Sequence, residues 1–477
     1  GSNPALRSIV SRIHLFLLTR LLSGHVSQRV CSFRYGVGVQ ESAEIRLVAA
    51  GMQRGALCAT LALNSSGEYC MNKKQVGAWA LFDFANSVYP AVIVSVVFQI
   101  YFIETIVGNE AGEGDALWGR AVSLSALIVA LSAPVLGAIA DRAGVRKRFM
   151  AVFVAMCITG VALFTTLEPG MLLYGFILFL IANVGFEACL VFYNAYLPEI
   201  VPQEKQGWVS GLGFGVGYAG SALGLVMALQ YATSNIQIVW IMVAGMFLLF
   251  SIPTFLYLPK DGNGSMTVPQ AAVWGLTGFR ELWGEVMAHT EMRRYLLAYF
   301  FYIDGVLTAI YMSSTLASNT FGYEQEELIY LYLAIQVAAL IGAFILAKPT
   351  DYLGPKKVVT GVLGLWIAIA IGIFFVESKE AFAVLGLLAG FGLGSIQAAS
   401  RAFMASLIPD GRESEMFGFY ALCGKSSSVI GPLIFGQVAL MTGGNQKFSV
   451  MSISVLFVVG ACLLQRVNDP KAALVKI

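Results

Sequence analysis

The chain has 477 residues, of which 57% are hydrophobic and only 12% are charged, with a formal net charge of +2. A soluble globular protein carries about twice that share of charged residues, so the composition excludes a soluble domain and favours a membrane protein. No basic run with interleaved aromatic residues points to nucleic acid, and the seven cysteines lack the spacing of a disulfide framework or a metal site.

Residues 1–70 form an N-terminal extension whose composition differs from the rest. They hold seven arginines, no lysine and many serines, but no apolar stretch of spanning length. Transit peptides share this composition, but we expect a disordered extension with no role in the core function. The reason is that Met71-Asn-Lys73-Lys74 resembles a natural start directly before the first apolar span.

Twelve apolar runs follow, each long enough to cross ~30 Å of hydrocarbon as a helix. Backbone polar groups in lipid need partners within the segment, so these runs predict helices rather than open strands. We place the spans at 79–104, 118–140, 149–167, 171–195, 208–232, 237–258, 295–320, 328–350, 358–376, 381–406, 416–440 and 448–466.

One long connection, 259–294, separates the sixth span from the seventh. It carries a stripe of apolar residues at helical spacing, opposite charged ones: Phe279, Leu282, Trp283, Val286 and Met287. This pattern predicts an amphipathic helix on the membrane surface. The expected organisation is an extension 1–70, an N-terminal six-helix bundle 71–258, a cytoplasmic linker 259–294, a C-terminal six-helix bundle 295–467 and a cytoplasmic tail 468–477.

Lysine and arginine lie mostly on one side of the predicted spans. The loops on the Met71 side carry most of them, whereas the opposite loops carry only Lys379 and Lys447. Cytoplasmic loops are enriched in basic residues, so both termini are expected in the cytoplasm. The expected location is a bacterial cytoplasmic membrane.

One basic loop pattern occurs twice, once in each half. The first copy runs from Gly137 to Arg148 and reads Gly-Ala-Ile-Ala-Asp-Arg-Ala-Gly-Val-Arg-Lys-Arg, and the second runs from Asp351 to Lys357 and reads Asp-Tyr-Leu-Gly-Pro-Lys-Lys. An even number of spans per half makes the repeats parallel, and such transporters bind their solute between the halves near the midplane. The predicted fold is therefore all-α, with twelve transmembrane helices in two parallel six-helix bundles.

These loops resemble a motif of the major facilitator superfamily, found between spans two and three and, in weaker form, between spans eight and nine. A narrower resemblance is to the vacuole-effluxer-like family, named for the fungal autophagy-related vacuolar amino-acid effluxer. Four strings carry it, namely 79–87, 193–198, 210–214 and 411–420. The resemblance covers about 71–470, and it implies solute transport by twelve helices, with amino-acid export as the family's best-known activity.

The loop motif predicts a latch between the halves. Gly137 lets two helices approach closely, Gly144 permits a tight turn, and Asp141 can accept hydrogen bonds from an arginine or a helix N-terminus. We predict that the latch holds an outward-open state; the alternative is that its charges only set the topology. Ala347 and Tyr352 depart from the motif in the second copy, which favours a weaker latch there. The predicted gating residues are Gly137, Asp141, Arg142, Gly144, Arg146, Lys147, Asp351, Gly354 and Lys356.

Ionisable residues inside the spans mark the candidate binding site, because lipid disfavours them unless they face a cavity or a partner. The resemblance implies that spans one, four, seven and ten line the cavity, and each of the four carries a charged residue. The candidate substrate- and proton-binding residues are Asp83, Asn86, Glu187, Asn194, Asp304, Gln397, Arg401 and Lys425.

Each charge also has a structural alternative. Asp83 can cap its helix, and Arg401 can extend to the membrane interface. Glu187 can be a protonated acid bonded to Asn183. Asp304 can form a structural pair with the lysine of span eleven, which lies at a similar depth.

These features predict a secondary active transporter that moves a small polar solute, an amino acid or a related metabolite, by alternating access. Proton-coupled export is the leading version. The expected partners are a small-molecule substrate, protons and membrane lipid; the chain is expected to be a monomer without cofactor or metal.

No Gly-x-x-x-x-Gly-Lys-Ser/Thr motif occurs, so ATP does not drive it directly, and no enzyme motif lies in a span. The alternatives are a lipid or lysolipid translocator and a non-transporting membrane sensor.

Overall fold

The computed structural model describes residues 71–108, 113–232, 234–427, 430–443 and 445–469. The chain divides into two compact units, Gly1–Asn72 and Lys73–Ile477, and the helices given below belong to the second. The predicted extension 1–70 and the last part of the predicted tail lie outside the described residues. Within those residues the chain is helical and contains no strand, so the all-α fold is confirmed.

The first half of the described chain forms the N-terminal bundle. Its elements are α4 (Lys73–Tyr89), the π-helix Pro90–Val94, α5 (Val97–Ile100), the π-helix Tyr101–Val107, α6 (Glu113–Ala143), α7 (Arg146–Leu163), α8 (Leu172–Asn194), α9 (Tyr196–Ile200), α10 (Gln206–Tyr231) and α11 (Ile236–Tyr257). Span one is longer than predicted and irregular in its second half. Pro90 explains this, because proline gives no N–H to the helix ladder. In the π-helix that begins at Pro90, the Ser95 N–H and hydroxyl both donate to the Pro90 carbonyl.

The second half forms the linker and the C-terminal bundle. Its helices are α12 (Val268–Thr277), α13 (Phe279–Ala288), α14 (Thr290–Phe321), α15 (Gln325–Tyr352), α16 (Pro355–Phe375), α17 (Lys379–Leu407), α18 (Glu413–Ser427), α19 (Ile430–Met441) and α20 (Gln446–Gln465). The described residues contain 11 helices long and apolar enough to cross a membrane. The remaining predicted span, 416–440, is occupied by α18 and α19 together. Each of the twelve predicted spans therefore carries helix.

The outer surface of the helices is apolar, as a lipid environment requires. Leu131, Leu249 and Phe375 are 62%, 61% and 75% exposed, and many other large apolar side chains are exposed with them. Soluble proteins rarely expose so much apolar surface. Aromatic rings fill the interior instead; Phe98, for example, stacks on Phe164 with ring centroids 3.9 Å apart. This distribution is that of a multi-pass membrane protein.

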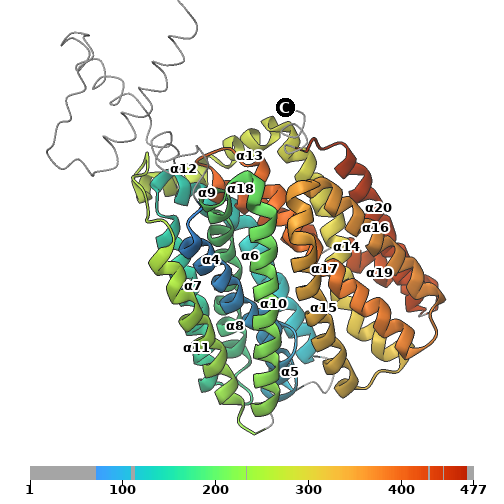
Figure 1. Cartoon of the computed structure of the whole chain (residues 1–477). Helices are drawn as coiled ribbons and strands as arrows, with labels where there is room; N and C mark the ends of the chain where they lie inside the picture. The colour runs from blue at the N-terminus through green and yellow to red at the C-terminus, as the bar shows by residue number, and fades with distance from the viewer. Residues whose placement is uncertain (1–70, 109–112, 233, 428–429, 444, 470–477) are drawn as a thin grey trace, which may run out of the picture. The chain divides into compact units, whose positions relative to one another are not determined.

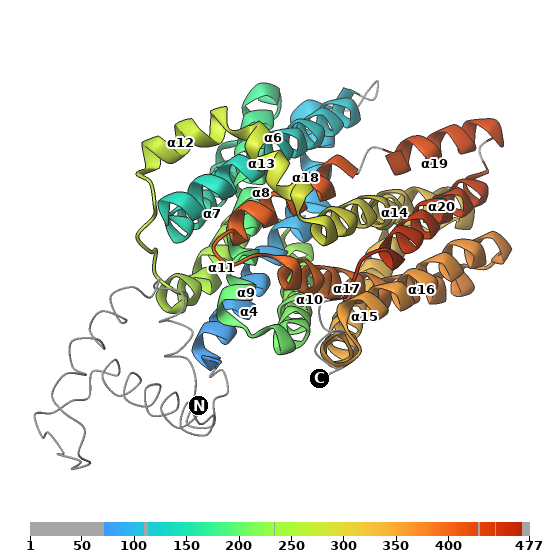
Figure 2. The ribbon, with the colours of Figure 1, turned by 90° about the horizontal axis from the view of Figure 1, so that it is seen from above.

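The two bundles lie side by side (Figure 1, Figure 2), with α4 to α11 on one side and α14 to α17, α19 and α20 on the other, and α18 lies between them against α6. They meet mainly where α6 packs on α18 and α10 packs on α15. We call the end of the bundles that carries the two loop motifs, 141–146 and 351–356, the motif end. The helices α9, α12 and α13 lie at this end as well (Figure 1).

The linker contains the predicted helix, α13, and a second helix that the apolar stripe did not predict. On α13, Leu282 and Val286 are buried against the protein, whereas Phe279 and Trp283 of the same stripe are exposed. The second helix, α12, packs on α6. It starts with a capping box at Thr267, a start signal that is visible in the sequence.

Candidate functional site

An ion pair between the bundles joins Arg401 of α17 to Asp83 of α4. Arg401 Nη2 lies 2.9 Å from Asp83 Oδ2, and Nη1 lies 3.3 Å from Oδ1. The two residues are only 3% and 5% exposed. Because both are removed from water, each charge is stabilised mainly by the other, and two roughly parallel hydrogen bonds fix their geometry.

The N-terminal bundle supplies further partners of Arg401. Its Nε donates to Ser210 Oγ at 3.0 Å, its Nη2 to Ser210 O at 2.9 Å, and its Nη1 to Asn194 Oδ1 at 3.4 Å. The guanidinium carbon also lies 4.6 Å and 4.0 Å from the ring centroids of Trp79 and Phe214, within range of a cation–π interaction. Arg401 therefore docks into the opposite bundle, and the alternative that it extends to the membrane interface is wrong.

Asp83 lies inside its helix rather than at the start. Since α4 begins at Lys73, the alternative that Asp83 caps the helix is also wrong. Asn86, one turn further along, donates to Asp83 Oδ1 at 3.4 Å. Four of the candidate residues from the sequence, Asp83, Asn86, Asn194 and Arg401, thus form one cluster.

A second ion pair crosses the interface between Lys425 of α18 and Glu187 of α8, with Nζ 2.5 Å from Oε1. Two structural alternatives for these charges are wrong. Asn183 donates to Ser125 Oγ at 2.7 Å and not to Glu187. Asp304 does not contact Lys425, because Lys425 points toward the other bundle, whereas Asp304 points toward α19 of its own bundle.

The last two candidates lie outside these ion pairs. Gln397 Oε1 accepts a hydrogen bond from the Tyr218 hydroxyl at 2.6 Å, which is a third polar link between the bundles. Asp304 is fully buried and accepts the Gly431 N–H at 2.8 Å and the Thr308 hydroxyl at 3.4 Å. The structure therefore brings seven of the eight candidates to the bundle interface and leaves Asp304 within the C-terminal bundle.

The two ion pairs are sorted by bundle. Both acids, Asp83 and Glu187, belong to the N-terminal bundle, and both bases, Arg401 and Lys425, belong to the C-terminal bundle. If the bundles separate, one wall of the gap presents carboxylates and the facing wall presents cations. Such a gap can receive a solute that carries both signs of charge.

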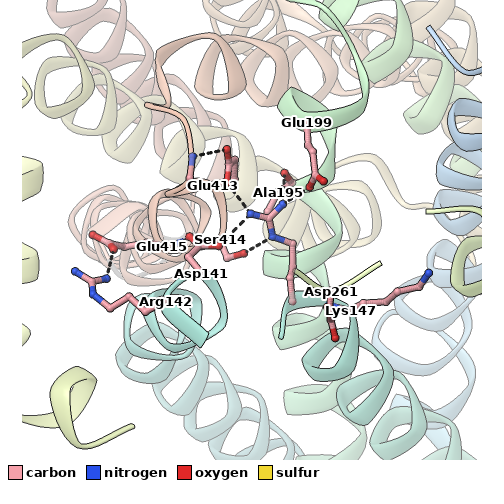
Figure 3. Close-up of polar contacts among 11 residues, drawn as sticks. Asp141, Arg142, Lys147, Ala195, Glu199, Asp261, Glu413, Ser414 and Glu415 are labelled. Carbon is pink, nitrogen blue, oxygen red and sulfur yellow. Dashed lines mark hydrogen bonds and ion pairs between the residues drawn. The ribbon is translucent and has the colours of Figure 1, made fainter. Parts of the chain in front are cut away.

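The first loop motif joins α6 to α18 at the motif end. Asp141 Oδ2 accepts the Glu415 N–H at 2.9 Å, in the first turn of α18 (Figure 3). The N–H groups of a first turn have no helical partner and carry partial positive charge, so a carboxylate is favoured there. A side chain at Gly137 would collide with the Ser414 backbone, so this glycine permits the approach.

Arg146 lies at the centre of this contact, among carboxylates from both bundles. Its guanidinium is 3.0 Å from Asp141, 2.6 Å from Glu199 and 2.6 Å from Glu413, and its Nε donates to Ser414 Oγ at 2.8 Å. Because Glu413 and Ser414 belong to the C-terminal bundle, Arg146 links the two bundles at the start of α18, as Asp141 does.

Arg142 extends the network to the linker. Its Nη1 lies 2.9 Å from Glu415 Oε2, and its guanidinium carbon lies 3.4 Å from the Trp274 ring centroid of α12. Glu285 of α13 pairs with Arg412 and lies 3.9 Å from Arg142. The hydrogen bond to Glu285 raises the pKa of Arg412, so this guanidinium remains charged.

The second loop motif makes the corresponding contact between α15 and α10. Asp351 accepts the N–H groups of Gly207 and Trp208 at 2.7 and 2.8 Å, at the start of α10. Ala347 fits here because the facing residue is Gly211, at which a Cβ would collide with the Ala347 side chain. The glycine absent from the second motif is thus replaced by one on the partner helix, and the carboxylate contact is kept.

The motif lysines hold neighbouring helices within each bundle. Lys147 Nζ donates to a carbonyl after α11 at 2.8 Å, and Lys356 Nζ donates to one after α20 at 2.7 Å. Gly144 and Gly354 make the turns, with φ of 64° and 91°, which favour glycine.

The sequence-based prediction missed the acidic half of the contact at the motif end. Glu413, Ser414 and Glu415 at the start of α18, and Glu199 of α9, were not among the predicted gating residues. A signal was present, since two acids open the helix after a loop on the same side of the membrane as the basic motif. Charge complementarity between these loops would have identified them.

We expect Gly137→Val to destabilise the motif-end contact by about 1–3 kcal/mol, because the added side chain overpacks α6 against the Ser414 backbone. Thermal unfolding in detergent and transport by reconstituted protein measure this. The matched control is Gly119→Ala in the same helix, where an added Cβ meets nothing within 4 Å. Equal stability of the two variants would contradict the close packing described here.

Comparison with known proteins agrees with this architecture. The family model described as "Vacuole effluxer Atg22 like" matches residues 119–474. The chain is 29% identical over 415 residues to an uncharacterized MFS-type transporter of Bacillus subtilis, covering 83% of this chain and 95% of the relative. It is 23% identical over 436 residues to autophagy-related protein 22 of Coccidioides immitis, covering 73% and 72%.

Two solved structures share the fold at low identity. The human organic anion transporter MFSD10 has a TM-score of 0.68 at 17% identity, covering 82% of this chain and 99% of that one. The proton:xylose symporter XylE has a TM-score of 0.66 at 15% identity, covering 83% and 96%. These likenesses show the major facilitator fold. With the family match over most of its length, the chain belongs to the vacuole effluxer Atg22-like family of MFS-type transporters.

Proposed function

We propose that this transporter exports amino acids or chemically related zwitterions from a bacterial cytoplasm by alternating access, coupled to protons. The observation that carries the proposal is the sorting of charge across the bundle interface. Asp83 and Glu187 face Arg401 and Lys425, each acid in ion contact with a base of the other bundle. The bias of basic residues to the motif end supports its placement in the cytoplasm.

The ion pairs give a physical reason for a zwitterionic substrate. Parting the bundles leaves Asp83 and Arg401 without a counterion, which is costly for groups so far from water. A bound ammonium group can replace the guanidinium beside Asp83, and a bound carboxylate can replace Asp83 beside Arg401. The substrate thereby lowers the energy of the parted state relative to the closed one, which is the differential binding that alternating access requires.

The contacts at the motif end support an assignment of the stage in this proposed cycle. Asp141 and Asp351 each bind a helix start of the opposite bundle, so the bundles are closed at this end. With the motif end in the cytoplasm, the structure corresponds to an inward-closed stage. Loading of cargo from the cytoplasmic side requires both carboxylates to leave these N–H groups.

Counterflow in proteoliposomes tests the substrate class. Liposomes preloaded with unlabelled leucine should take up radiolabelled leucine faster than liposomes preloaded with xylose or glutarate. Glu187→Gln should lower this exchange by about tenfold or more, the effect of ~1.4 kcal/mol, because the Lys425 pair is lost. Glu327→Gln is the matched control, since Glu327 pairs with Lys379 at 2.7 Å in an exposed position.

The other substrate classes give distinct results. Exchange of glutarate alone would favour an organic anion held by Arg401 and Lys425, and translocation of a labelled lysolipid without solute exchange would favour a lipid translocator. Either result would contradict the amino-acid proposal. The absence of any exchange would favour a non-transporting sensor.

A further inference from the structure

Asp304 is a buried acid whose environment differs from that of the other candidate carboxylates. It lies near the middle of α14, ~21 Å along the helix from Thr290 at 1.5 Å per residue. Its side chain is 0% exposed. Its hydrogen bonds come from the Gly431 N–H at 2.8 Å and, more weakly, from the Thr308 hydroxyl at 3.4 Å.

Asp304 makes no ion pair with any described residue. Asp83 and Glu187, in contrast, each contact a base of the opposite bundle. The charged and titratable interior groups on helices packed against α14 are Tyr332 of α15, Arg401 of α17, and Tyr420, Cys423 and Lys425 of α18. Cys462 of α20 is exposed. None of these groups forms a hydrogen bond or an ion pair with Asp304. Arg401 and Lys425 pair with acids of the other bundle, and α19 carries no charged residue.

A carboxylate in this position is poorly stabilised in its charged form. One backbone N–H and one distant hydroxyl replace only part of the hydration that a carboxylate has in water, and lipid and apolar side chains supply none. When protonated, the same group is neutral and needs little compensation. The position therefore allows either state, whereas Asp83 and Glu187 each contact a base of the opposite bundle.

We propose that Asp304 is the proton-binding residue of this transporter. This inference rests on the proton coupling in the proposed function and assigns it to one carboxyl group. A proton that binds an Asp304 oxygen neutralises the side chain and is released unchanged when the oxygen is next exposed to the other side. No covalent bond other than O–H forms or breaks.

The contact with α19 explains how proton binding can move a helix. Gly431 lies in the first turn of α19, where N–H groups have no helical partner. A charged Asp304 favours this positive helix end, and protonation removes most of that attraction. A side chain at Gly431 would collide with the Thr308 hydroxyl, so the glycine permits the approach. The charge of Asp304 therefore controls how firmly α14 holds α19.

Infrared spectroscopy of the purified full-length protein tests this without a substrate. In a pH titration, wild-type protein should show a carboxyl C=O band that disappears as the pH rises, and Asp304→Asn should lack that band. Asp83→Asn and Glu187→Gln should retain it, because those acids are ion-paired. A titrating band in Asp304→Asn equal to that of wild type would overturn the proposal.

Should Asp304→Asn fail to fold, Asp304→Glu keeps the test decisive. A longer side chain moves the carboxyl group, so the band should persist at a changed frequency and midpoint; an unchanged band would mean that it arises elsewhere. In proteoliposomes, Asp304→Asn should lose the leucine accumulation that a pH gradient drives, whereas the control Glu327→Gln, in an exposed ion pair, should keep it. An Asp304→Asn variant that still accumulates leucine with the gradient would contradict the assignment. Failure of wild-type counterflow would instead contradict the proposed substrate, whatever the infrared result.

Discussion

Replacing Arg401 by alanine should destabilise the transporter by about 3–5 kcal/mol and abolish solute exchange. Asp83 is 5% exposed, so the truncation leaves a buried carboxylate without its counterion. It also removes the donors to Ser210 and Asn194 and empties the space between Trp79 and Phe214. Unfolding in mixed detergent micelles measures the stability, and leucine counterflow measures the activity.

A double substitution separates the ion pair from its packing. Asp83→Asn combined with Arg401→Gln keeps neutral hydrogen-bonding groups at both positions, so it should be markedly more stable than Arg401→Ala, because no unpaired charge remains. It should still fail to exchange a zwitterion, since neither charge is available. Wild-type stability of Arg401→Ala would show that the pair is not desolvated in the membrane and would refute this account.

The helices and the loop motifs could be predicted because their signals are local. A charge-free run of spanning length admits little other than a helix in lipid, and Asp141 and Gly144 are recognisable from adjacent residues. The irregular second half of span one was harder to predict from the sequence. Pro90 could be read from the sequence, but whether its helix kinks, breaks or widens into π geometry depends on neighbouring helices.

The partners of the charged residues could not be predicted, for a geometric reason. Sequence position gives the depth of a residue along its span, and on that basis Asp304 and Lys425 were judged to be close in depth. It gives no direction around the helix axis relative to other helices. The structure supplies that direction, and it turns Lys425 toward Glu187 of the other bundle.

The second loop motif illustrates a related limit. Ala347 in place of glycine favoured a weaker latch when the motif was judged alone. Close approach of two helices requires a small residue on either one of them, and Gly211 on α10 meets that requirement. A motif read along one helix cannot show compensation by the facing helix, because the residues are far apart in sequence.

Replacing Arg146 by alanine should open the motif end. The substitution leaves Asp141, Glu199 and Glu413 close together without their shared cation, in a place where Arg146 itself is only 13% exposed. Removing one partner of such a charge network costs at least about 2 kcal/mol. That energy favours the open state by roughly thirtyfold, since the carboxylates regain water when the bundles separate.

Spin labels at Glu204 and Lys357, which are exposed on the two bundles at the motif end, report this opening as a longer distance. Arg148→Ala is the matched control in the same motif, because the Arg148 side chain is 76% exposed and, among the described residues, forms an ion pair with Asp261 alone, at 3.4 Å. It should leave the distance distribution unchanged. Were Arg146→Ala to leave the distances unchanged too, the Asp141 contact with the α18 helix start would suffice to hold the end closed. The guanidinium would then serve only to balance local charge.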